Sequence, residues 1–342
     1  MATDKPINVA VVGAGVFGQH HARVYHEMER QGQGVALTAI VDPDQQRAAA
    51  VGAEFGAPVF ASVAEMLQRA GIQAASVTVP TVKHLEVSSA LMQAGVDVLI
   101  EKPLASTLEE ADELIRLAQH TGRIAQAGHL ERFNPAVRAT VPLLTRPMFF
   151  EVHRLSLFSP RALDVDVVLD LMTHDLDIVL SFVNSPVKEI RAVGLPILSG
   201  KVDIANVRME FDSGCVANFT ASRVSTERVR KLRFFQPHQY ISIDYSRQDV
   251  LVFAVEPAAT PPPVPEPAAD SPFKLPPGSP QIRMTKPAVT PEEPLQAELR
   301  SFLQAVRERS RPLVPLEEGR RALEVALQIL ERIKEHARRA NL

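Results

Sequence analysis

The chain has 342 residues, of which 46% are hydrophobic and 23% are charged, and its formal net charge is −3. This near-neutral charge excludes a large basic surface for nucleic acid, and no stretch reaches the roughly 20 apolar residues that span a bilayer. The single cysteine, Cys215, excludes an internal disulfide and a cysteine-based metal site. The opening segment MATDKPINVAVVG has no basic leader, so we expect a cytoplasmic chain with no membrane, metal or nucleic-acid partner.

Residues 1–125 alternate short aliphatic runs with helical stretches. The runs show little polar alternation, which is typical of parallel strands covered on both faces. They read INVAVV, ALTAIVD, AASVTV, DVLIE and RIAQAG. We therefore predict a Rossmann domain, an α/β fold with a doubly wound parallel sheet, for this part of the chain.

The alternation of strand-like and helical segments ends before residues 126–342. A helical pattern over about 162–183 precedes several strand-like segments, from VKEIRAVGLPIL to DVLVFAV, some joined by turn signals such as DSG at 212–214. Strands that follow one another in this way indicate a mostly antiparallel sheet. Two amphipathic helices over about 292–338 end the chain. We predict a second, α+β domain with an open sheet, which binds substrate and, through the uncovered face of its sheet, another subunit.

Prolines gather between residues 257 and 294, above all in EPAATPPPVPEPAADSPFKLPPGSP. Because proline supplies no amide donor, we interpret this segment as a surface excursion that forms neither helix nor sheet. Its PxxP spacings leave docking of a partner protein as an alternative.

A glycine motif follows the first predicted strand. Gly13, Gly15 and Gly18 stand in GxGxxG spacing before a helix, with Val16 and Phe17 inside the motif. The first glycine permits a tight turn, the second lets the backbone approach a pyrophosphate, and the third lets helix and strand pack closely. The helix N-terminus then receives the phosphates. These five residues are predicted to bind a dinucleotide.

Asp42 closes the second predicted strand, where a carboxylate accepts hydrogen bonds from the adenosine ribose. A carboxylate there repels a 2′-phosphate, and Pro43 follows it instead of an arginine, so the sequence favours NAD over NADP. The alternative is an aspartate that caps a helix beside a glycine-rich turn and binds no ligand.

The stretch DVLIEKPLA at 97–105 ends a predicted strand with a charge pair. Ligands of parallel sheets lie outside the carboxyl ends of the strands, so Glu101 and Lys102 are expected on the cofactor side. Pro103 holds the backbone that follows them. The alternative is a salt bridge at the rim of the sheet that does no chemistry.

Together these motifs resemble the Gfo/Idh/MocA family of NAD(P)-dependent sugar oxidoreductases. The resemblance covers nearly the whole chain except the proline-rich segment, and it includes the VPT..H segment, whose predicted cofactor-binding residues are Val79, Pro80, Thr81 and His84. It implies that Lys102 lies beside the nicotinamide and the substrate hydroxyl. The peptide bond between this lysine and the proline is often cis in the family, which implies a cis Lys102–Pro103 bond here. It also implies a homodimer or homotetramer.

The same family carries an aspartate and a histidine four residues apart on a helix of the second domain. Here VVLDLMTHDLDIVLSF supplies Asp170 and His174. At this spacing they share a helix face, joined by Asp166 and Asp177 along one polar stripe. A solvated acidic face without chemistry is the alternative.

Oxidation of a secondary alcohol needs a base for the hydroxyl proton. His174 is the natural base, and Asp170 can orient its imidazole and stabilise the protonated form. Lys102 would polarise the hydroxyl and stabilise developing alkoxide charge, or share in the proton transfer. Glu101 is expected to orient the lysine or to contact the nicotinamide ribose.

Two stretches, GHLERFNPAV at 128–137 and DLMTHDLDIV, resemble the branch of the family that oxidises the 3-hydroxyl of UDP-N-acetylglucosamine or a related nucleotide sugar. That branch serves the synthesis of lipopolysaccharide and other surface glycans. Arg132 is a candidate for a phosphate oxygen or sugar hydroxyl, Asn134 for two hydroxyls, and Arg154 and Arg161 for a diphosphate.

Two other functions remain open at this stage. One is another enzyme of the same architecture, such as an inositol or aldose dehydrogenase or a reductase. The other is a non-catalytic NAD-sensing or scaffold protein.

Overall fold

The computed structural model describes residues 5–158, 165–256 and 281–341. The chain forms two compact units. The first unit comprises Met1–Phe133 and Glu292–Leu327, and the second comprises Asn134–Pro291 and Gln328–Leu342. Arg161 and most of the proline-rich segment lie outside the described residues.

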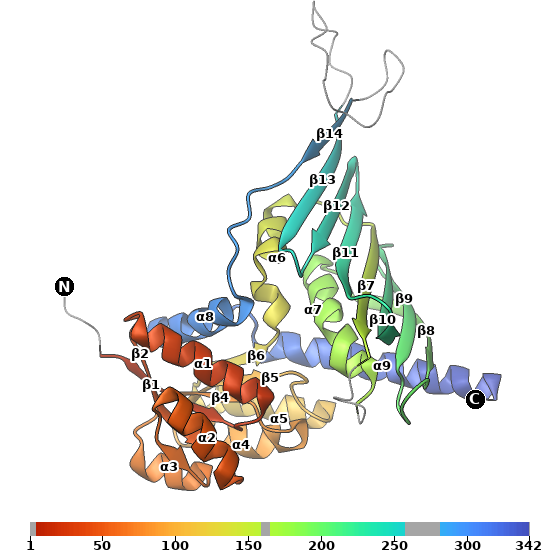
Figure 1. Ribbon diagram of the computed structural model, residues 1–342. Helices are drawn as coiled ribbons and strands as arrows, with labels where there is room; N and C mark the ends of the chain where they lie inside the picture. Colours follow the sequence, from red (N-terminus) through yellow and green to blue (C-terminus); the bar gives the residue numbers. More distant parts are fainter. Residues whose placement is uncertain (1–4, 159–164, 257–280, 342) are drawn as a thin grey trace, which may run out of the picture. The chain divides into compact units, whose positions relative to one another are not determined.

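The first unit contains a six-stranded parallel sheet with the order β3-β2-β1-β4-β5-β6. The sheet belongs to the red-to-yellow part of the chain in Figure 1. Its strands are β1 (Ile7–Val12), β2 (Val35–Val41), β3 (Val59–Phe60), β4 (Ala74–Val77), β5 (Asp97–Glu101) and β6 (Ala125–Gly128). Its helices are α1 (Val16–Arg30), α2 (Gln45–Phe55), α3 (Val63–Arg69), α4 (His84–Gln93), α5 (Leu108–Thr121) and α8 (Pro294–Glu308), with the short turns η1 (Thr81–Lys83) and η2 (Leu130–Phe133). The predicted doubly wound fold is confirmed.

Helix α8 corrects the expected division of the chain. It was assigned with the other C-terminal helix to the second domain, whereas its residues belong to the first unit. Its buried side chains Leu299, Phe302 and Leu303 share a hydrophobic core with Val24 of α1 and Val9 of β1. An amphipathic pattern shows that one face of a helix is buried, but it does not identify which core covers that face.

The second unit contains an eight-stranded sheet with the order β14-β13-β12-β11-β7-β10-β9-β8. Every neighbouring pair is antiparallel except β7 and β10, so the predicted mostly antiparallel sheet is confirmed. Its strands are β7 (Phe149–Leu157), β8 (Val187–Leu195), β9 (Ile204–Phe211), β10 (Val216–Ser225), β11 (Val229–Gln236), β12 (Gln239–Asp244), β13 (Asp249–Glu256) and β14 (Gln281–Thr285). Its helices are α6 (Pro135–Thr140), η3 (Val141–Leu143), the π-helical turn η4 (Val168–Met172) and α7 (Thr173–Phe182). Helix α9 (Leu316–Ala340) begins in the first unit, and its residues from Gln328 onward belong to the second.

Strand β14 corrects the expectation that residues 257–294 form neither helix nor sheet. Residues 281–285 pair with β13, and the run 281–286 contains no proline. Every amide of this short run is therefore available to a neighbouring strand. Strand β7 was also missed, although its side chains alternate between buried and partly exposed positions as a half-buried strand requires.

The helix expected over about 162–183 is shorter and irregular. Among the described residues, it begins near Val167 and its first turn, η4, is π-helical. The backbone amide of Val167 donates to the Val202 carbonyl at 2.9 Å, and the Asp166 carboxylate accepts from the Val202 amide at 2.9 Å. These two bonds tie the start of the helix to the segment that leads into β9.

Candidate functional site

The glycine motif forms the turn from β1 to α1, and each glycine has a separate structural reason. Gly13 has φ +103°, and a Cβ there would lie 2.7 Å from the Thr78 carbonyl. A Cβ on Gly18 would lie 1.8 Å from the Gly13 oxygen, so helix and turn pack too closely for any side chain. A Cβ on Gly15 would meet nothing within 4 Å. Gly15 therefore opens onto space at the N-terminus of α1, where backbone amides can bind an anion.

Asp42 is buried directly after β2, and both of its carboxylate oxygens accept backbone amides. Oδ2 accepts from Ala14 at 2.8 Å and Oδ1 accepts from Asp44 at 2.8 Å. The carboxylate is thus fixed against the glycine turn, and each oxygen keeps a lone pair for a ribose hydroxyl. The N-cap of α2 is Asp44, so capping does not explain Asp42.

A cavity of about 860 Å³ in the first unit brings together several predicted cofactor residues: Gly13, Gly15, Asp42, Val79 and Pro80. Sequence reasoning missed its apolar wall, which comes from α3 and α4 and includes Val63, Leu67 and Val87. It also missed Arg47, which lines the cavity and donates to the Asp44 carboxylate at 2.9 Å. An open glycine turn, a fixed carboxylate and an apolar wall fit a dinucleotide.

The remaining predicted cofactor residues do not line this cavity. Val16 and Phe17 are 54% and 39% exposed at the start of α1, and Thr81 opens η1. His84 is buried, and its ring nitrogens lie 3.0 Å from the Val79 carbonyl and 3.2 Å from the Leu104 carbonyl. Burial lowers the pKa of His84, although both carbonyls oppose this effect. His84 therefore joins the loop after β4 to the loop after β5, and the geometry assigns it a structural role.

Glu101 and Lys102 lie at the carboxyl end of β5, as expected for a rim position. The Lys102–Pro103 bond is cis, in agreement with the family resemblance. Glu101 is 7% exposed; its Oε1 lies 3.1 Å from His21 Nε2, and its Oε2 accepts from the Lys102 amide at 3.2 Å. Glu101 thus contacts the backbone amide of the lysine. His21 was missed, although it stands only three residues beyond the glycine motif.

Asp170 and His174 lie on either side of the junction between η4 and α7 in the second unit, and both side chains are partly buried. The Thr173 hydroxyl donates to the carbonyls of Val168 at 2.9 Å and Leu169 at 3.1 Å, which stabilises the π-helical turn. Such turns occur frequently at functional sites. The predicted polar stripe is shorter than expected because Asp177 is buried.

Arg154 does not present its guanidinium to a diphosphate as predicted. Both Arg154 and Asp175 are buried, and their side chains form two hydrogen bonds, at 2.6 Å from Nε and 2.9 Å from Nη2. The guanidinium also lies over the Tyr245 ring at 5.1 Å. Because β7 carries Arg154 and α7 carries Asp175 next to His174, this pair fixes α7 on the sheet.

The other predicted substrate ligands also have internal roles or lie outside the described chain. Asn134 is buried; its Oδ1 accepts from the Ala136 amide at 3.1 Å and its Nδ2 donates to the Tyr245 carbonyl at 3.1 Å. The geometry assigns it to the N-cap of α6, which corrects its expected role as a hydroxyl ligand. Arg132 forms an ion pair with Glu318 of α9. Arg161 is not among the described residues.

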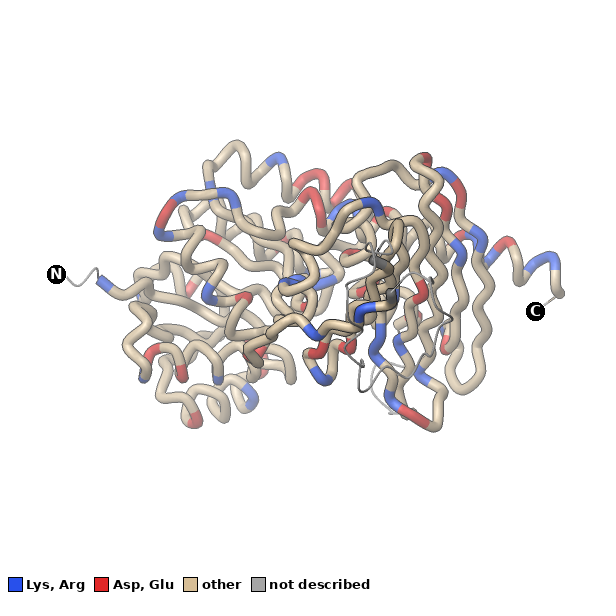
Figure 2. The backbone as a smooth tube through the Cα atoms, turned by 90° about the horizontal axis from the view of Figure 1, so that it is seen from above, with Lys and Arg blue, Asp and Glu red and all other residues tan. Residues whose placement is uncertain are grey.

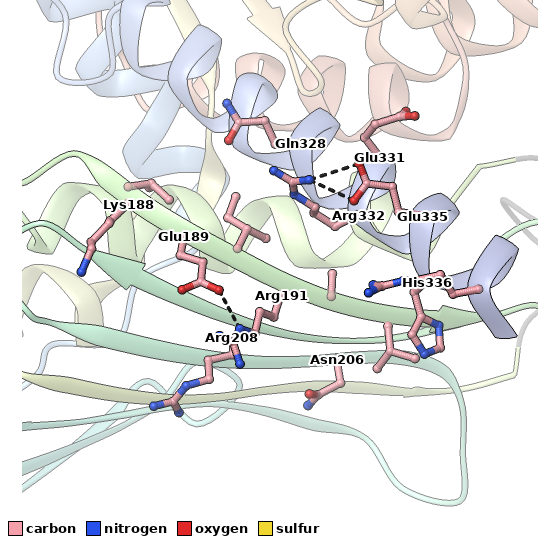
Figure 3. A pocket seen from close by; sticks show the side chains of 15 residues that line it. Lys188, Glu189, Arg191, Asn206, Arg208, Gln328, Glu331, Arg332, Glu335 and His336 are labelled. Carbon is pink, nitrogen blue, oxygen red and sulfur yellow. Dashed lines mark hydrogen bonds and ion pairs between the residues drawn. The ribbon is translucent and has the colours of Figure 1, made fainter.

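A larger cavity, of about 980 Å³, lies within the second unit between β8, β9 and the C-terminal part of α9 (Figure 3). It contains none of the predicted site residues, and ion pairs occupy its walls. Arg191 donates to Glu189 at 2.7 Å, and Arg332 donates to Glu335 at 2.9 Å. Basic and acidic residues are likewise interspersed along the described backbone (Figure 2).

None of the described helices is long and apolar enough to cross a membrane. No three histidine, cysteine, aspartate or glutamate side chains of the described chain gather as a metal site.

Comparison with known proteins decides the family. Residues 7–129 match the model described as "Oxidoreductase family, NAD-binding Rossmann fold", and residues 150–238 match the "GFO/IDH/MocA C-terminal domain". The chain is 33% identical to UDP-N-acetylglucosamine 3-dehydrogenase of Acidithiobacillus ferrooxidans over 94% of its own length and 96% of that protein. The chain belongs to the Gfo/Idh/MocA family of oxidoreductases. Its first unit accordingly contains the NAD-binding domain of this family.

Solved structures and a further relative agree with this assignment. The crystal structure of the same enzyme, GnnA of A. ferrooxidans, superimposes with a TM-score of 0.83 over 95% of this chain and 97% of that one, at 32% identity. Another relative, scyllo-inositol 2-dehydrogenase (NAD(+)) of Bacillus subtilis, is 28% identical over 64% of this chain and 68% of its own. Levoglucosan dehydrogenase in complex with NADH shares the fold, with a TM-score of 0.80 over 97% and 98% of the chains at 16% identity.

Proposed function

We propose that this chain oxidises the C3 hydroxyl of UDP-N-acetylglucosamine, or of a closely related nucleotide sugar, with NAD as hydride acceptor. The observation that carries the proposal is the similarity to UDP-N-acetylglucosamine 3-dehydrogenase over 94% of the chain, because so long a match includes both units. The oxidised sugar would serve the synthesis of surface glycans such as lipopolysaccharide.

In the first unit, the cofactor side of the parallel sheet would prepare the reaction. NAD, when bound, supplies the acceptor for the hydride. The turn around Gly13 and Gly15 would bind the pyrophosphate, and the fixed carboxylate of Asp42 would accept hydrogen bonds from the ribose hydroxyls. The ammonium group of Lys102 polarises the substrate hydroxyl and stabilises negative charge on its oxygen.

In the second unit, the junction of η4 and α7 would supply the base. His174 takes the hydroxyl proton onto its imidazole, and Asp170 orients the ring and stabilises its protonated form. The buried pair of Arg154 and Asp175 keeps the helix in place while the charge on the ring changes.

An inositol 2-dehydrogenase is the second candidate, favoured by the scyllo-inositol relative. The substrates of the two candidate enzymes differ in the diphosphate, which a nucleotide sugar has and an inositol lacks. Arg132 and Arg154, which were predicted to bind phosphate, are engaged with Glu318 and Asp175. The choice between the candidates therefore depends on the full-length similarity and on the experiment below.

A substrate panel tests the proposal directly. Purified protein is incubated with NAD or NADP and one of UDP-N-acetylglucosamine, UDP-N-acetylgalactosamine, free N-acetylglucosamine, glucose, myo-inositol or scyllo-inositol, and NADH or NADPH is followed at 340 nm. The proposal expects turnover of a nucleotide sugar, a product two mass units lighter, and a ¹³C signal for a carbonyl at C3. Turnover of inositols alone would assign the second candidate, and turnover of free sugars alone would assign an aldose dehydrogenase. No turnover with any compound would favour an NAD-sensing or scaffold protein.

The proposed assembly is a homo-oligomer formed through the outer face of the second unit's sheet. Phe149, Phe235, Tyr240 and Phe253 form a continuous row of ring contacts across four strands, with centroids 5.0 to 5.7 Å apart. Phe235 is 40% exposed and the other three rings are partly exposed, and an apolar row that reaches the surface in this way is typical of an interface. Light scattering of the wild type and of Phe235→Glu tests it, since a monomeric wild type would contradict the proposal.

A further inference from the structure

A chain of buried polar groups connects the core of the first unit to Glu101. The Tyr25 hydroxyl lies 2.9 Å from Ser76 Oγ, which lies 3.0 Å from His21 Nδ1, and His21 Nε2 lies 3.1 Å from Glu101 Oε1. Tyr25, Ser76 and His21 have no exposed surface. Two of these residues come from α1, one from β4 and one from β5, so the hydrogen bonds join three elements of the first unit.

Only one arrangement of protons satisfies this chain when Glu101 is ionised and His21 is neutral. A carboxylate only accepts hydrogen bonds, so the ring must donate from Nε2 to Glu101. Nδ1 of the neutral ring is then an acceptor, which receives the hydroxyl proton of Ser76. The Ser76 oxygen in turn accepts the proton of the Tyr25 hydroxyl. Every donor thus points toward Glu101.

The surroundings of Glu101 hold its carboxylate on three sides. His21 binds Oε1, and the backbone amide of Lys102 donates to Oε2 at 3.2 Å. On the neighbouring strand, a Cβ on Gly128 would lie 2.9 Å from Oε1, so a side chain there would displace the carboxylate. Burying a polar group costs folding free energy unless the group is hydrogen-bonded. Apolar side chains would fill the same space without this cost, so packing alone does not explain four linked polar groups.

We infer that His21, held by Ser76 and Tyr25, is a positioning residue that fixes Glu101 and, through the Lys102 amide, the placement of the catalytic lysine. The inference depends on the proposed function because it assigns His21 a part in the same reaction. His21 does not line the cavity that contains Gly13 and Asp42. Its loss therefore affects the alignment of Lys102 more than the affinity for the adenosine half of the cofactor.

Kinetics of matched variants provide the first test. His21→Leu removes the donor to Glu101, and we expect kcat to fall by about 10²-fold, as for a catalytic group misplaced by about 1 Å, while the Kd for NAD changes by less than about threefold. His21→Gln can still donate to Glu101 and should recover most of the rate. His26→Leu is the control on the same helix, outside the chain of hydrogen bonds. A kcat that is unchanged in His21→Leu, or equally low in His21→Gln with folding intact, would overturn the inference.

A second test does not require turnover. Long-range ¹H–¹⁵N NMR of the imidazole groups, with His21→Gln used to assign the signal, reports which ring nitrogen of His21 carries the proton. The inference expects a neutral ring protonated at Nε2, with its signal shifted in Glu101→Gln and in Ser76→Ala. A ring protonated at Nδ1 alone would contradict it. If the wild type oxidises no compound in the substrate panel, the proposed function fails, whereas this measurement still decides the state of His21.

Discussion

The two units place their candidate residues in different ways. In the first unit, Gly13, Asp42, Val79 and Lys102 each follow a separate strand of one parallel sheet. The carboxyl ends of parallel strands meet at one edge, so the topology itself gathers these residues. In the second unit the sheet is mostly antiparallel, and Asp170 and His174 depend on a helix that begins with a π-helical turn and is fixed by a buried ion pair. A functional site can thus be built into the topology of a sheet or depend on a few local bonds.

Replacement of Lys102 is the most severe test of the first arrangement. We expect Lys102→Ala to lower kcat by about 10²–10⁴-fold, because in the proposed reaction the ammonium group acts on the substrate oxygen. NAD affinity, measured by fluorescence titration, should stay within about threefold because Lys102 does not line the cavity with Gly13 and Asp42. Lys188→Ala is the control, a surface lysine that pairs with Glu210. A variant with normal kcat would show that the rim position carries no chemistry.

Replacement of Arg154 tests the second arrangement. Arg154→Ala leaves Asp175 charged, buried and without its guanidinium, and we expect a loss of about 3–5 kcal/mol in the free energy of unfolding. The double variant Arg154→Met/Asp175→Leu removes both charges and should recover most of that stability. Urea unfolding followed by circular dichroism gives both values. If the single variant is as stable as the wild type, the ion pair does not hold α7.

A smaller effect is expected at Asp203, which organises the connection between β8 and β9. Burial opposes its ionisation, yet the amides of Ser199, Leu198 and Ile197 and the Ser199 hydroxyl outweigh burial and lower the pKa of Asp203 from 3.8 to about 2. Because the pKa is lowered on folding, this stabilisation is complete above about pH 4 and disappears as the pH falls through 2.

Asp203→Asn checks this pH dependence. We expect the variant to lose about 1.5–3 kcal/mol of unfolding free energy at pH 7, since hydrogen bonds to a charged group are lost. The difference from the wild type should shrink between about pH 4 and pH 2. A difference that is constant over this range would mean that the charge of Asp203 is not what stabilises the loop.

The buried thiol of Cys215 can report when the second unit unfolds, independently of NAD binding by the first unit. Cys215 is buried between β9 and β10, and burial raises the pKa of its thiol to about 11. A thiol with this pKa is mostly protonated at pH 8 and reacts slowly. We expect no labelling by a disulfide reagent in the folded protein and full labelling during urea unfolding. Labelling that precedes the loss of NAD binding would show that the second unit opens first.

The sequence predicted the first unit well because its signals are local. The glycine motif, Asp42 and the EKP segment each stand next to their own strand, so spacing alone locates them. The roles of Arg132, Asn134 and Arg154 were missed for the opposite reason. Their partners lie on other elements, 186 positions away for Arg132, 111 for Asn134 and 21 for Arg154. Composition does not indicate which of these groups will pair with a given side chain. The same limit concealed the link between His21 and Glu101, which are 80 residues apart.

The π-helical turn has a consequence for how the helix that carries His174 tolerates insertions and deletions. A π-helical turn closes its hydrogen bonds over five residues where an α-helix uses four, so η4 contains one residue more than a regular helix would need. Deleting Leu171, which lies between Asp170 and His174, would allow a continuous α-helix. Such a deletion would also change the side of the helix on which Asp170 lies relative to His174, although both residues and their buried neighbours would remain. The length of this segment is therefore as much a requirement for the proposed site as the identity of its side chains.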